Sequence, residues 1–282
     1  MTKQENNTFI GPVMQKVIIG TIFITATLFL ALPSIGQPTA GLDITLRFDY
    51  SSAEQMLDFF DRQSYNTDRV AATPGNKIAA ATSLLLARTN RGPEDFSRQL
   101  ELVRDDFNTT DDIYGLKETQ AHVSQLRKLL AEIRKRQLDR RVVATVQSYF
   151  PPDSKLAGII PVYVVAMGNE KAAAFVRSVV WKNNQPVFVS QNEGNQVIVL
   201  NLTRMLAFGG DVNSQFIELL GTLAHECFHA FFWLYQKNSG VWQSFHARKE
   251  PVWTLAELVE NEGIAYYLSL QLQIGGQTPS KP

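Results

Sequence analysis

Two histidines and a glutamate in one apolar segment have the spacing of a metal site. His225 and His229 are four residues apart within the run 216–234, and Glu226 directly follows the first histidine. A helix has 3.6 residues per turn, so the two imidazoles lie on one face and can bind the same ion. Glu226 is turned about 100° away from that face, where it can reach a metal-bound water without being a ligand. The pattern predicts a zinc site, with Zn²⁺ as the cofactor and a water that performs hydrolysis.

The residues around this motif favour a buried helix. Most of them are apolar, and polar groups in a buried helix need partners, which a metal ion would supply. The alternative is a surface helix with two solvated histidines, and the apolar surroundings disfavour it. Cys227 is the only cysteine, so no intrachain disulfide can form. It lies about 200° round the helix from His225, which predicts a buried thiol and not a nucleophile.

Length and composition allow a sizeable core but suggest no charged partner. The chain has 282 residues, of which 45% are hydrophobic, enough for one large domain or two small ones that share a core. The formal net charge is zero, so no overall field attracts nucleic acid or an anionic membrane. We therefore expect neither partner, and the oligomeric state does not follow from the sequence.

The first 36 residues resemble a secretory signal peptide. A polar start with Lys3 and Lys16 precedes an uncharged apolar run over residues 17–32, and Ser34 and Gly36 provide small residues before a cleavage site at Gln37. An uncleaved membrane anchor is the alternative, because the run is only slightly short for a span. Either way, we expect the rest of the chain to be exported, to the periplasm or the medium, or anchored to the membrane.

The remaining chain predicts an α+β fold that is mostly helical. Residues 42–48 alternate like a strand, and helices are expected over 51–62, 76–89, 93–107 and 116–138. Short runs rich in Val and Ile at 159–167, 186–190 and 196–202 predict a small sheet, the last two runs pairing as a hairpin. The edge of this sheet could hold an extended peptide, or the sheet could only pack under the metal helix. We expect one domain over 37–282, with a helical part over 37–150 and the sheet and zinc-site helices over 151–282.

Basic residues gather between Arg127 and Arg141 on the last of these N-terminal helices. We expect them to form a solvated face paired with the acidic segment 101–112, a partner-binding patch being the alternative. On the same helix, the spacing of His122 with the leucines that follow it predicts a histidine packed in the core.

The metal helix is expected to begin at Asn213-Ser214, and a final helix is expected over 252–274. A catalytic zinc usually has three protein ligands and an open fourth position. On the final helix Glu257, Glu260 and Glu262 are all candidates for the third ligand.

A second motif resembles a known clan. The pair formed by His225–His229 and the helix segment Asn261-Glu262-Gly263-Ile264-Ala265 resembles the gluzincin clan of zinc metallopeptidases, and the longer segment to Tyr267 is similar to its peptidase MA-like branch. The resemblance implies a zincin-like fold with Glu262 as the third zinc ligand. Residues 48–58 are also similar to a bacterial domain family of unknown function described as a zinc-dependent peptidase.

One position departs from the thermolysin-like pattern. That pattern has an aspartate four residues after the ligand glutamate, where it orients a zinc-bound histidine, whereas this chain has Tyr266. Glu257, Tyr266 and backbone carbonyls remain candidates for that role. Gly263 is expected to let this helix approach the metal helix closely.

These patterns predict an exported zinc metallopeptidase that acts on a peptide or protein substrate. Glu226 would be the general base, with His246 as first choice and Tyr267 as a further candidate for the oxyanion and the leaving amine. Arg248 could bind a substrate carboxylate. Two alternatives stay open: a non-catalytic envelope binding or scaffold protein that keeps a zincin fold, and a zinc hydrolase of a non-peptide amide or ester.

Overall fold

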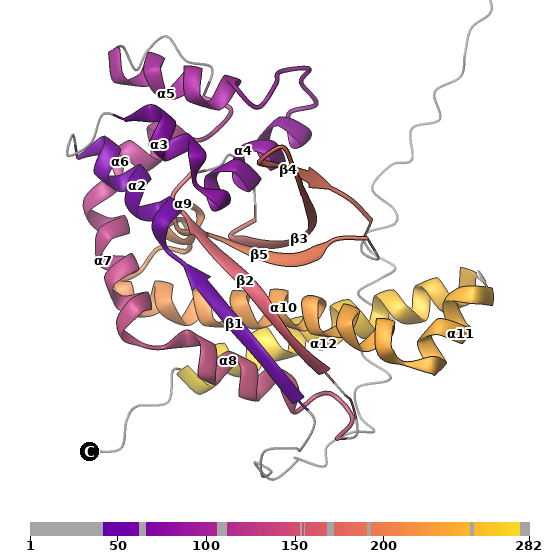
Figure 1. The fold of residues 1–282 in the computed structure, drawn as a ribbon. Coiled ribbons are helices and arrows are strands. Elements are labelled where there is room, and N and C mark those ends of the chain that lie inside the picture. Colours follow the sequence, from indigo (N-terminus) through magenta and orange to yellow (C-terminus); the bar gives the residue numbers. More distant parts are fainter. Residues whose placement is uncertain are drawn as a thin grey trace, which may run out of the picture. The chain divides into compact units, whose positions relative to one another are not determined.

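The computed structural model shows a mostly helical chain with one five-stranded sheet (Figure 1), so the predicted α+β class is confirmed. It describes residues 42–61, 66–105, 112–152, 154, 156–167, 172–190, 193–248 and 251–276, and the predicted signal segment 1–36 lies outside them. Among the helices described, none has both the length and the apolar composition needed to cross a membrane. The elements are β1 (Leu42–Asp49), α2 (Ser51–Phe60), α3 (Thr67–Ala72), α4 (Pro74–Leu86), α5 (Asp95–Asp105), α6 (Leu116–Ala121), α7 (Val123–Lys135), α8 (Leu138–Gln147), β2 (Leu156–Val165), β3 (Ala174–Lys182), β4 (Gln185–Phe188), β5 (Asn195–Asn201), α9 (Leu202–Met205), η3 (Leu206–Phe208), α10 (Val212–Asn238), α11 (Gly240–Arg248) and α12 (Pro251–Gly276).

The sheet has the strand order β1-β2-β5-β3-β4, with β1, β2 and β5 parallel and β3 and β4 antiparallel to their neighbours. The predicted hairpin between the last two Val- and Ile-rich runs is wrong, because β3 lies between β4 and β5. Instead, β3 and β4 form the hairpin. Its two turn residues, Asn183 and Asn184, have φ of 49° and 60°, as a two-residue turn with positive φ at both positions requires. The sequence did not predict β3 because its buried and exposed residues do not alternate regularly.

Helices cover both faces of the central strand β2. The consecutive residues Val162, Tyr163 and Val164 are all buried, as expected for a parallel strand between two layers. Helices α2 and α4 pack against β2, and α10 packs against β2, β5 and β3. The metal-motif helix is therefore part of the main core.

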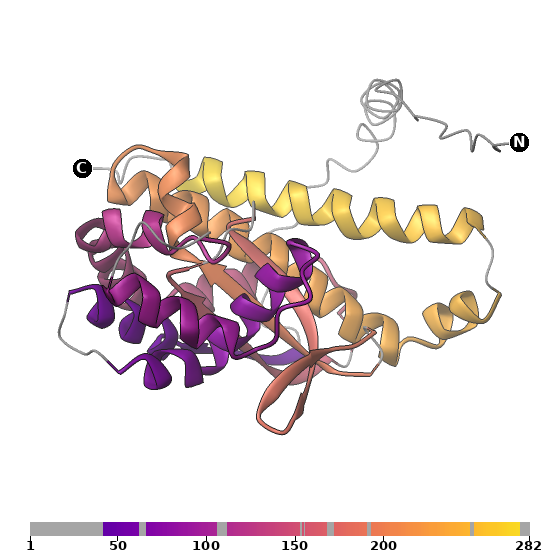
Figure 2. The same ribbon diagram turned by 90° about the horizontal axis from the view of Figure 1, so that it is seen from above.

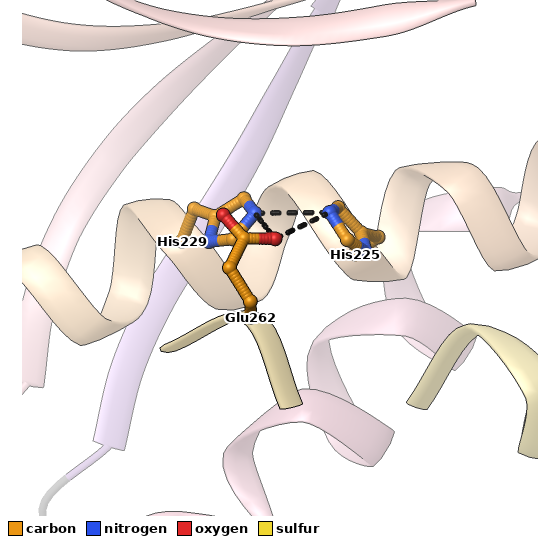
Figure 3. Close-up of side chains that lie close together, drawn as sticks. All are labelled: His225, His229 and Glu262. Carbon is orange, nitrogen blue, oxygen red and sulfur yellow. Dashed lines mark hydrogen bonds and ion pairs between the residues drawn. The ribbon is translucent and has the colours of Figure 1, made fainter. Parts of the chain in front are cut away.

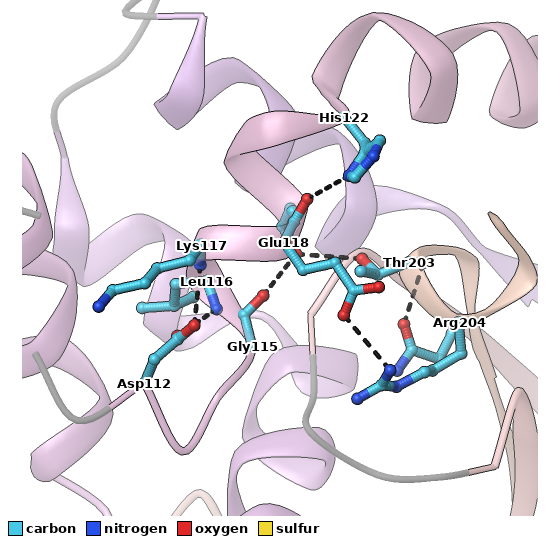
Figure 4. A network of polar contacts seen from close by, with 10 residues as sticks. Asp112, Gly115, Leu116, Lys117, Glu118, His122, Thr203 and Arg204 are labelled. Atoms are coloured by element: carbon cyan, nitrogen blue, oxygen red, sulfur yellow. Dashed lines mark hydrogen bonds and ion pairs between the residues drawn. The ribbon is translucent and has the colours of Figure 1, made fainter. Parts of the chain in front are cut away.

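The helix predicted over 116–138 is two helices. It breaks at His122, whose φ of −121° is not helical, and α7 then continues to Lys135. Leu126, Leu129 and Ile133 are buried as predicted, but His122 is only half-buried. Its Nδ1 donates a 2.9 Å hydrogen bond to the carbonyl of Glu118 (Figure 4). The histidine thus caps a helix end and is not part of the core stripe.

A polar network joins α6 to α9 (Figure 4). The hydroxyls of Thr119 and Thr203 lie 3.0 Å apart, and Arg204 pairs with Glu118 at 3.3 Å. At the start of α6, the Asp112 carboxylate accepts hydrogen bonds from two backbone amides, which satisfies donors that the helix leaves free. The contacts between α6 and α9 tie the helical half of the chain to the segment that follows β5.

The basic residues of α7 pair with α2 and not with the segment 101–112. Arg127 binds Asp58 at 2.7 Å and Asp61 at 2.5 Å, and Arg134 binds Glu54. The expected acidic partner was therefore wrong for these described residues. The carboxylates of α2 lie far away in sequence, so only the packing of α7 on α2 brings the charges together.

Candidate metal centre

Helix α10 places His225 and His229 side by side on one face. The helix begins at Val212, one residue before the predicted start, because the Asp211 side chain accepts a 2.8 Å hydrogen bond from the Ser214 amide. The two histidine Nε2 atoms are 3.0 Å apart, and each side chain is less than one-fifth exposed. Figure 3 shows the two rings converging on a common point.

Glu262 reaches the same point from α12. Its Oε2 atom lies 3.8 Å from the Nε2 of His225 and 3.8 Å from the Nε2 of His229 (Figure 3). In a tetrahedral zinc site with bonds of about 2.0–2.2 Å, neighbouring ligand atoms are about 3.4 Å apart. The three observed distances are close to this value. The group can therefore hold a metal ion.

Hydrogen bonds on the other side of each ring fix the tautomers. His229 Nδ1 lies 2.8 Å from the Asn261 Oδ1, and the His225 ring hydrogen-bonds to the backbone of Ala265. Both partners are acceptors, so each ring carries its proton on Nδ1 and directs an Nε2 lone pair at its neighbour. Two lone pairs 3.0 Å apart repel unless a cation lies between them. The residues present thus fit a divalent metal bound by neutral imidazoles.

The role of Asn261 was not predicted, although it is part of the second motif. It directly precedes Glu262, so one turn of α12 supplies both a candidate ligand and the group that orients His229. The Ala265 backbone matches the earlier expectation that a carbonyl could orient a histidine. The pKa of His225 is lowered, first by burial and then by His229, which keeps its ring neutral.

Close approach between α10 and α12 depends on Gly221 and not on Gly263. A Cβ atom at Gly221 would lie 2.9 Å from the Ser269 Oγ and 3.0 Å from the Ser269 carbonyl oxygen, whereas a Cβ at Gly263 would meet nothing within 4 Å. The expectation for Gly263 was therefore wrong. Position 263 is exposed, because the face of α12 that meets α10 carries Ala265 and Leu268.

The Glu226 side chain is half-buried beside the metal group. Burial raises the pKa of Glu226 to about 7, and Glu262 adds to the rise, while His229, Arg177 and a backbone hydrogen bond from Val176 oppose it. Val176 and Arg177 belong to β3, the strand that the sequence did not predict. The strand places a backbone donor and a cation next to the predicted general base.

His246 and Tyr267 are not part of the group His225, His229 and Glu262. The His246 Nε2 is 3.2 Å from a carboxylate oxygen of Glu257 on α12, and the Tyr267 hydroxyl accepts a 2.9 Å hydrogen bond from Gln271. The aromatic ring next to the metal group is that of Tyr266, 4.9 Å from the His225 ring. Tyr266 follows Glu262 by four residues and shares its face, whereas a residue five positions on points away. The side chain of Arg248 lies outside the described part of the chain.

The other acidic residues of α12 do not join the group. Glu257 is bound by His246 and by Gln236, at 2.5 Å, and the pKa of Glu260 is raised by burial and by nearby Glu257. Cys227 is fully buried, as predicted, and burial raises the pKa of its thiol. A reactive cysteine is therefore excluded at this site.

Two cavities meet at the metal group. We call the first, of about 360 Å³, the polar chamber; its walls include Ser178, Gln196, Gln236, Glu257 and Asn261. We call the second, of about 730 Å³, the apolar chamber; its walls include Leu86, Ala87, Ile113, Ala172 and Ala174. Both are lined by Phe175, Arg177, Glu226, His229 and Glu262. The predicted base and two of the candidate ligands thus lie where the chambers join.

Arg177 was also missed by the sequence analysis, since a single arginine in an unrecognised strand gives no signal. Its guanidinium carbon lies 4.7 Å from the ring centre of Phe175 and 5.8 Å from that of Phe188. These rings hold the guanidinium on the side of the sheet from which Arg177 lines both chambers. Among the chamber walls described, Arg177 is the one lysine or arginine.

A family model described as "Putative zinc dependent peptidase (DUF5700)" matches residues 67–278. The chain belongs to this family. The matched residues include α4, β3 and both motif helices, and therefore every residue that lines the two chambers. The segment 48–58, which is similar to such a family, lies before the matched residues. Searches of curated proteins and of solved structures find no match.

Proposed function

We propose that this chain is an exported zinc metallopeptidase with a zincin-like fold of gluzincin type. His225, His229 and Glu262 would hold the zinc ion, and Glu226 would be the general base. The observation that carries the proposal is the convergence of two Nε2 lone pairs and one carboxylate beside a second, half-buried carboxylate at the junction of two chambers.

A zinc ion bound there would lower the pKa of a bound water toward about 7 and polarise the scissile carbonyl. The Glu226 carboxylate would accept the proton that is released during attack and return it to the departing amine nitrogen. Arg177 lies beside Glu226 and would offset negative charge that develops on the substrate. His246 and Tyr267 have other partners and are not part of this proposal.

The edge of β3 supports a peptide as substrate. Residues 174–178 pair with β5 on one side. On the other side β4 pairs with β3 from Val179 onward and the Val189 amide donates a 3.1 Å hydrogen bond to the Ser178 carbonyl, so residues 174–177 form the edge. Phe175, Val176, Arg177 and Ser178 line the polar chamber, and Ala174 lines the apolar chamber. An extended chain could therefore lie along this strand and cross both chambers.

The test is zinc content combined with turnover of a mixed peptide library. We expect one zinc per chain, and Glu226→Gln should keep the zinc while turnover falls by roughly 10²- to 10⁴-fold. Glu218→Gln is a matched control, because Glu218 lies two turns earlier on α10 and hydrogen-bonds to Gln273. Unchanged turnover in zinc-loaded Glu226→Gln would refute the mechanism.

The same measurements separate the alternatives. A non-catalytic scaffold would have a closed zinc site with a fourth protein ligand, whereas three candidate ligands converge among the residues described. A hydrolase of non-peptide amides or esters would bind zinc but leave the peptide library intact. Export rests on the segment 1–36 alone, and N-terminal sequencing of the mature protein tests whether the chain begins at Gln37.

A further inference from the structure

The apolar chamber has features of a side-chain recognition site. Its volume of about 730 Å³ is roughly twice that of the polar chamber and falls within the roughly 300–1,000 Å³ of typical ligand pockets. The metal group and Glu226 make one side of it polar, and apart from Ser83 and Arg177 the remaining walls are apolar. A mostly apolar hollow beside a few convergent polar groups is the usual composition of a binding site.

Small residues create the space. Ala87 directly follows α4, Ala172 lies just before β3 and Ala174 begins it, so two segments that are distant in sequence both present small side chains to the chamber. At the rim, the Leu86 side chain is 57% exposed, and Ile113 is half-buried. An apolar ligand would cover both surfaces and gain free energy from their removal from water.

The polar chamber has a more polar lining, although Phe232 and Trp233 also belong to its walls. Ser178, Gln196, Gln236 and Asn261 contribute polar groups, and the carboxylate of Glu257 is already bound by Gln236 and His246. A substrate that crosses the metal group therefore meets a mostly apolar lining on the α4 side and a more polar, mixed lining on the other side. The asymmetry restricts which residue can lie next to the scissile bond on that side.

We propose that the apolar chamber binds a large apolar side chain, such as that of leucine or phenylalanine, directly next to the cleaved bond. The cleavage part rests on the proposed peptidase function, while the binding part does not. The helical half of the chain, through α4 and the turn at Ile113, is then part of substrate recognition.

The test uses the zinc-loaded Glu226→Gln chain and two peptides that differ only in a central leucine or serine. Binding is measured by calorimetry or fluorescence anisotropy. Burial of the leucine side chain should make its peptide bind about 10- to 100-fold more tightly.

Two neighbouring leucines on α4 provide a matched pair of variants. Leu86 lines the chamber and is 57% exposed, whereas Leu85 is 59% exposed and lines neither chamber. Leu86→Glu should reduce the leucine preference to within a few-fold, because it places a charge at the chamber mouth. Leu85→Glu adds the same charge near the same helix end and should keep the preference.

A third variant is included in case Leu86→Glu has only a small effect on peptide binding. Ala87 is exposed with helical backbone angles, so Ala87→Trp should fold and fill part of the chamber, again weakening the leucine peptide more than the serine peptide. Equal binding of the two peptides, or equal changes from Leu86→Glu and Leu85→Glu, overturns the proposal.

Turnover of peptides by the unmodified chain separates the proposed recognition site from the proposed peptidase function. Preferential binding without cleavage keeps the apolar chamber as a recognition site and removes the peptidase function. Cleavage with no preference for apolar residues keeps the peptidase function and removes the recognition site.

Discussion

Helices α10 and α12 both supply residues of the candidate metal centre, but they are held in different ways. Helix α10 packs on the sheet and on α7, α8, α11 and α12, and most of its apolar residues are buried. Helix α12 packs mainly on α10 and exposes several large apolar side chains, among them Leu255, Leu258 and Val259. Figure 2 shows α12 lying along the outer side of α10.

This difference indicates how the site is built. The two histidines and Glu226 are fixed by the core, because moving them would disturb the sheet contacts of α10. Glu262 and Asn261 are placed by one helix–helix interface. We expect residues of α10 to set whether the site exists and residues of the interface to tune how tightly it holds the metal.

Removal of a ligand should have the largest effect. His229→Ala and Glu262→Ala should each lower zinc affinity by more than the roughly 10- to 100-fold typical of a residue that only orients a ligand. Glu262→Asp should lie between Glu262→Ala and the unmodified chain, because α12 has one main interface and can shift toward the metal. Metal analysis and competition with a chelator measure the affinities, and full zinc binding by Glu262→Ala would show that another residue is the third ligand.

Loss of the hydrogen-bond partner of His229 should have the second-largest effect on zinc binding. Asn261→Ala removes the acceptor 2.8 Å from Nδ1, so zinc affinity should fall by roughly 10- to 100-fold. Asn261→Asp keeps an acceptor and should retain most of the affinity. Glu260→Gln, one position earlier on α12, is the control. If Asn261→Ala binds zinc as tightly as Glu260→Gln does, the tautomer of His229 is set by another group.

Substitutions at Gly221 and Gly263 compare the α10–α12 interface with the exposed face of α12. Gly221→Ala places a Cβ 3.0 Å or less from atoms of Ser269, so α12 must shift, at a cost of about 1–3 kcal/mol of unfolding free energy and with weaker zinc binding. Gly263→Ala meets nothing within 4 Å and should stabilise the helix by about 0.5–1 kcal/mol. Denaturant unfolding measures both. Equal destabilisation by the two changes would contradict the packing described for α12.

The smallest effect is expected at Cys227. The thiol is fully buried in α10, so a thiol reagent should not label the native protein but should label one site after unfolding. Removal of zinc with a chelator should leave it unlabelled, because the sheet and not the metal holds α10. Labelling on chelation alone would show that α10 depends on the metal as much as α12 does.

The sequence was most informative where the signal is local. The spacing of His225 and His229 and the apolar run around them predicted a buried helix with both rings on one face, and the strands near 42–49, 156–165 and 195–201 were visible from their composition. Helix α11, the break at His122 and strand β3 were not predicted, because each depends on a local geometry that neighbouring residues do not encode strongly.

Tertiary structure decided the surroundings of the motif. Arg177 and Val176 reach Glu226 only because β3 enters the sheet between β5 and β4. The apolar chamber lies between the end of α4 and the start of β3, two segments that are far apart in the sequence. Tyr266 lies beside His225, whereas Tyr267 lies beside Gln271, because α12 meets α10 through one particular face.

By itself, therefore, the sequence determined which residues of the two motifs share a helix face, and it predicted zinc as the metal that such donors prefer. The pairing of Asn261 with His229, the position of Gly221 at the helix contact and the two unlike chambers were decided by the fold alone. The physical reason is that helical periodicity is set by residues three and four positions apart, whereas contacts between elements depend on packing across the whole chain.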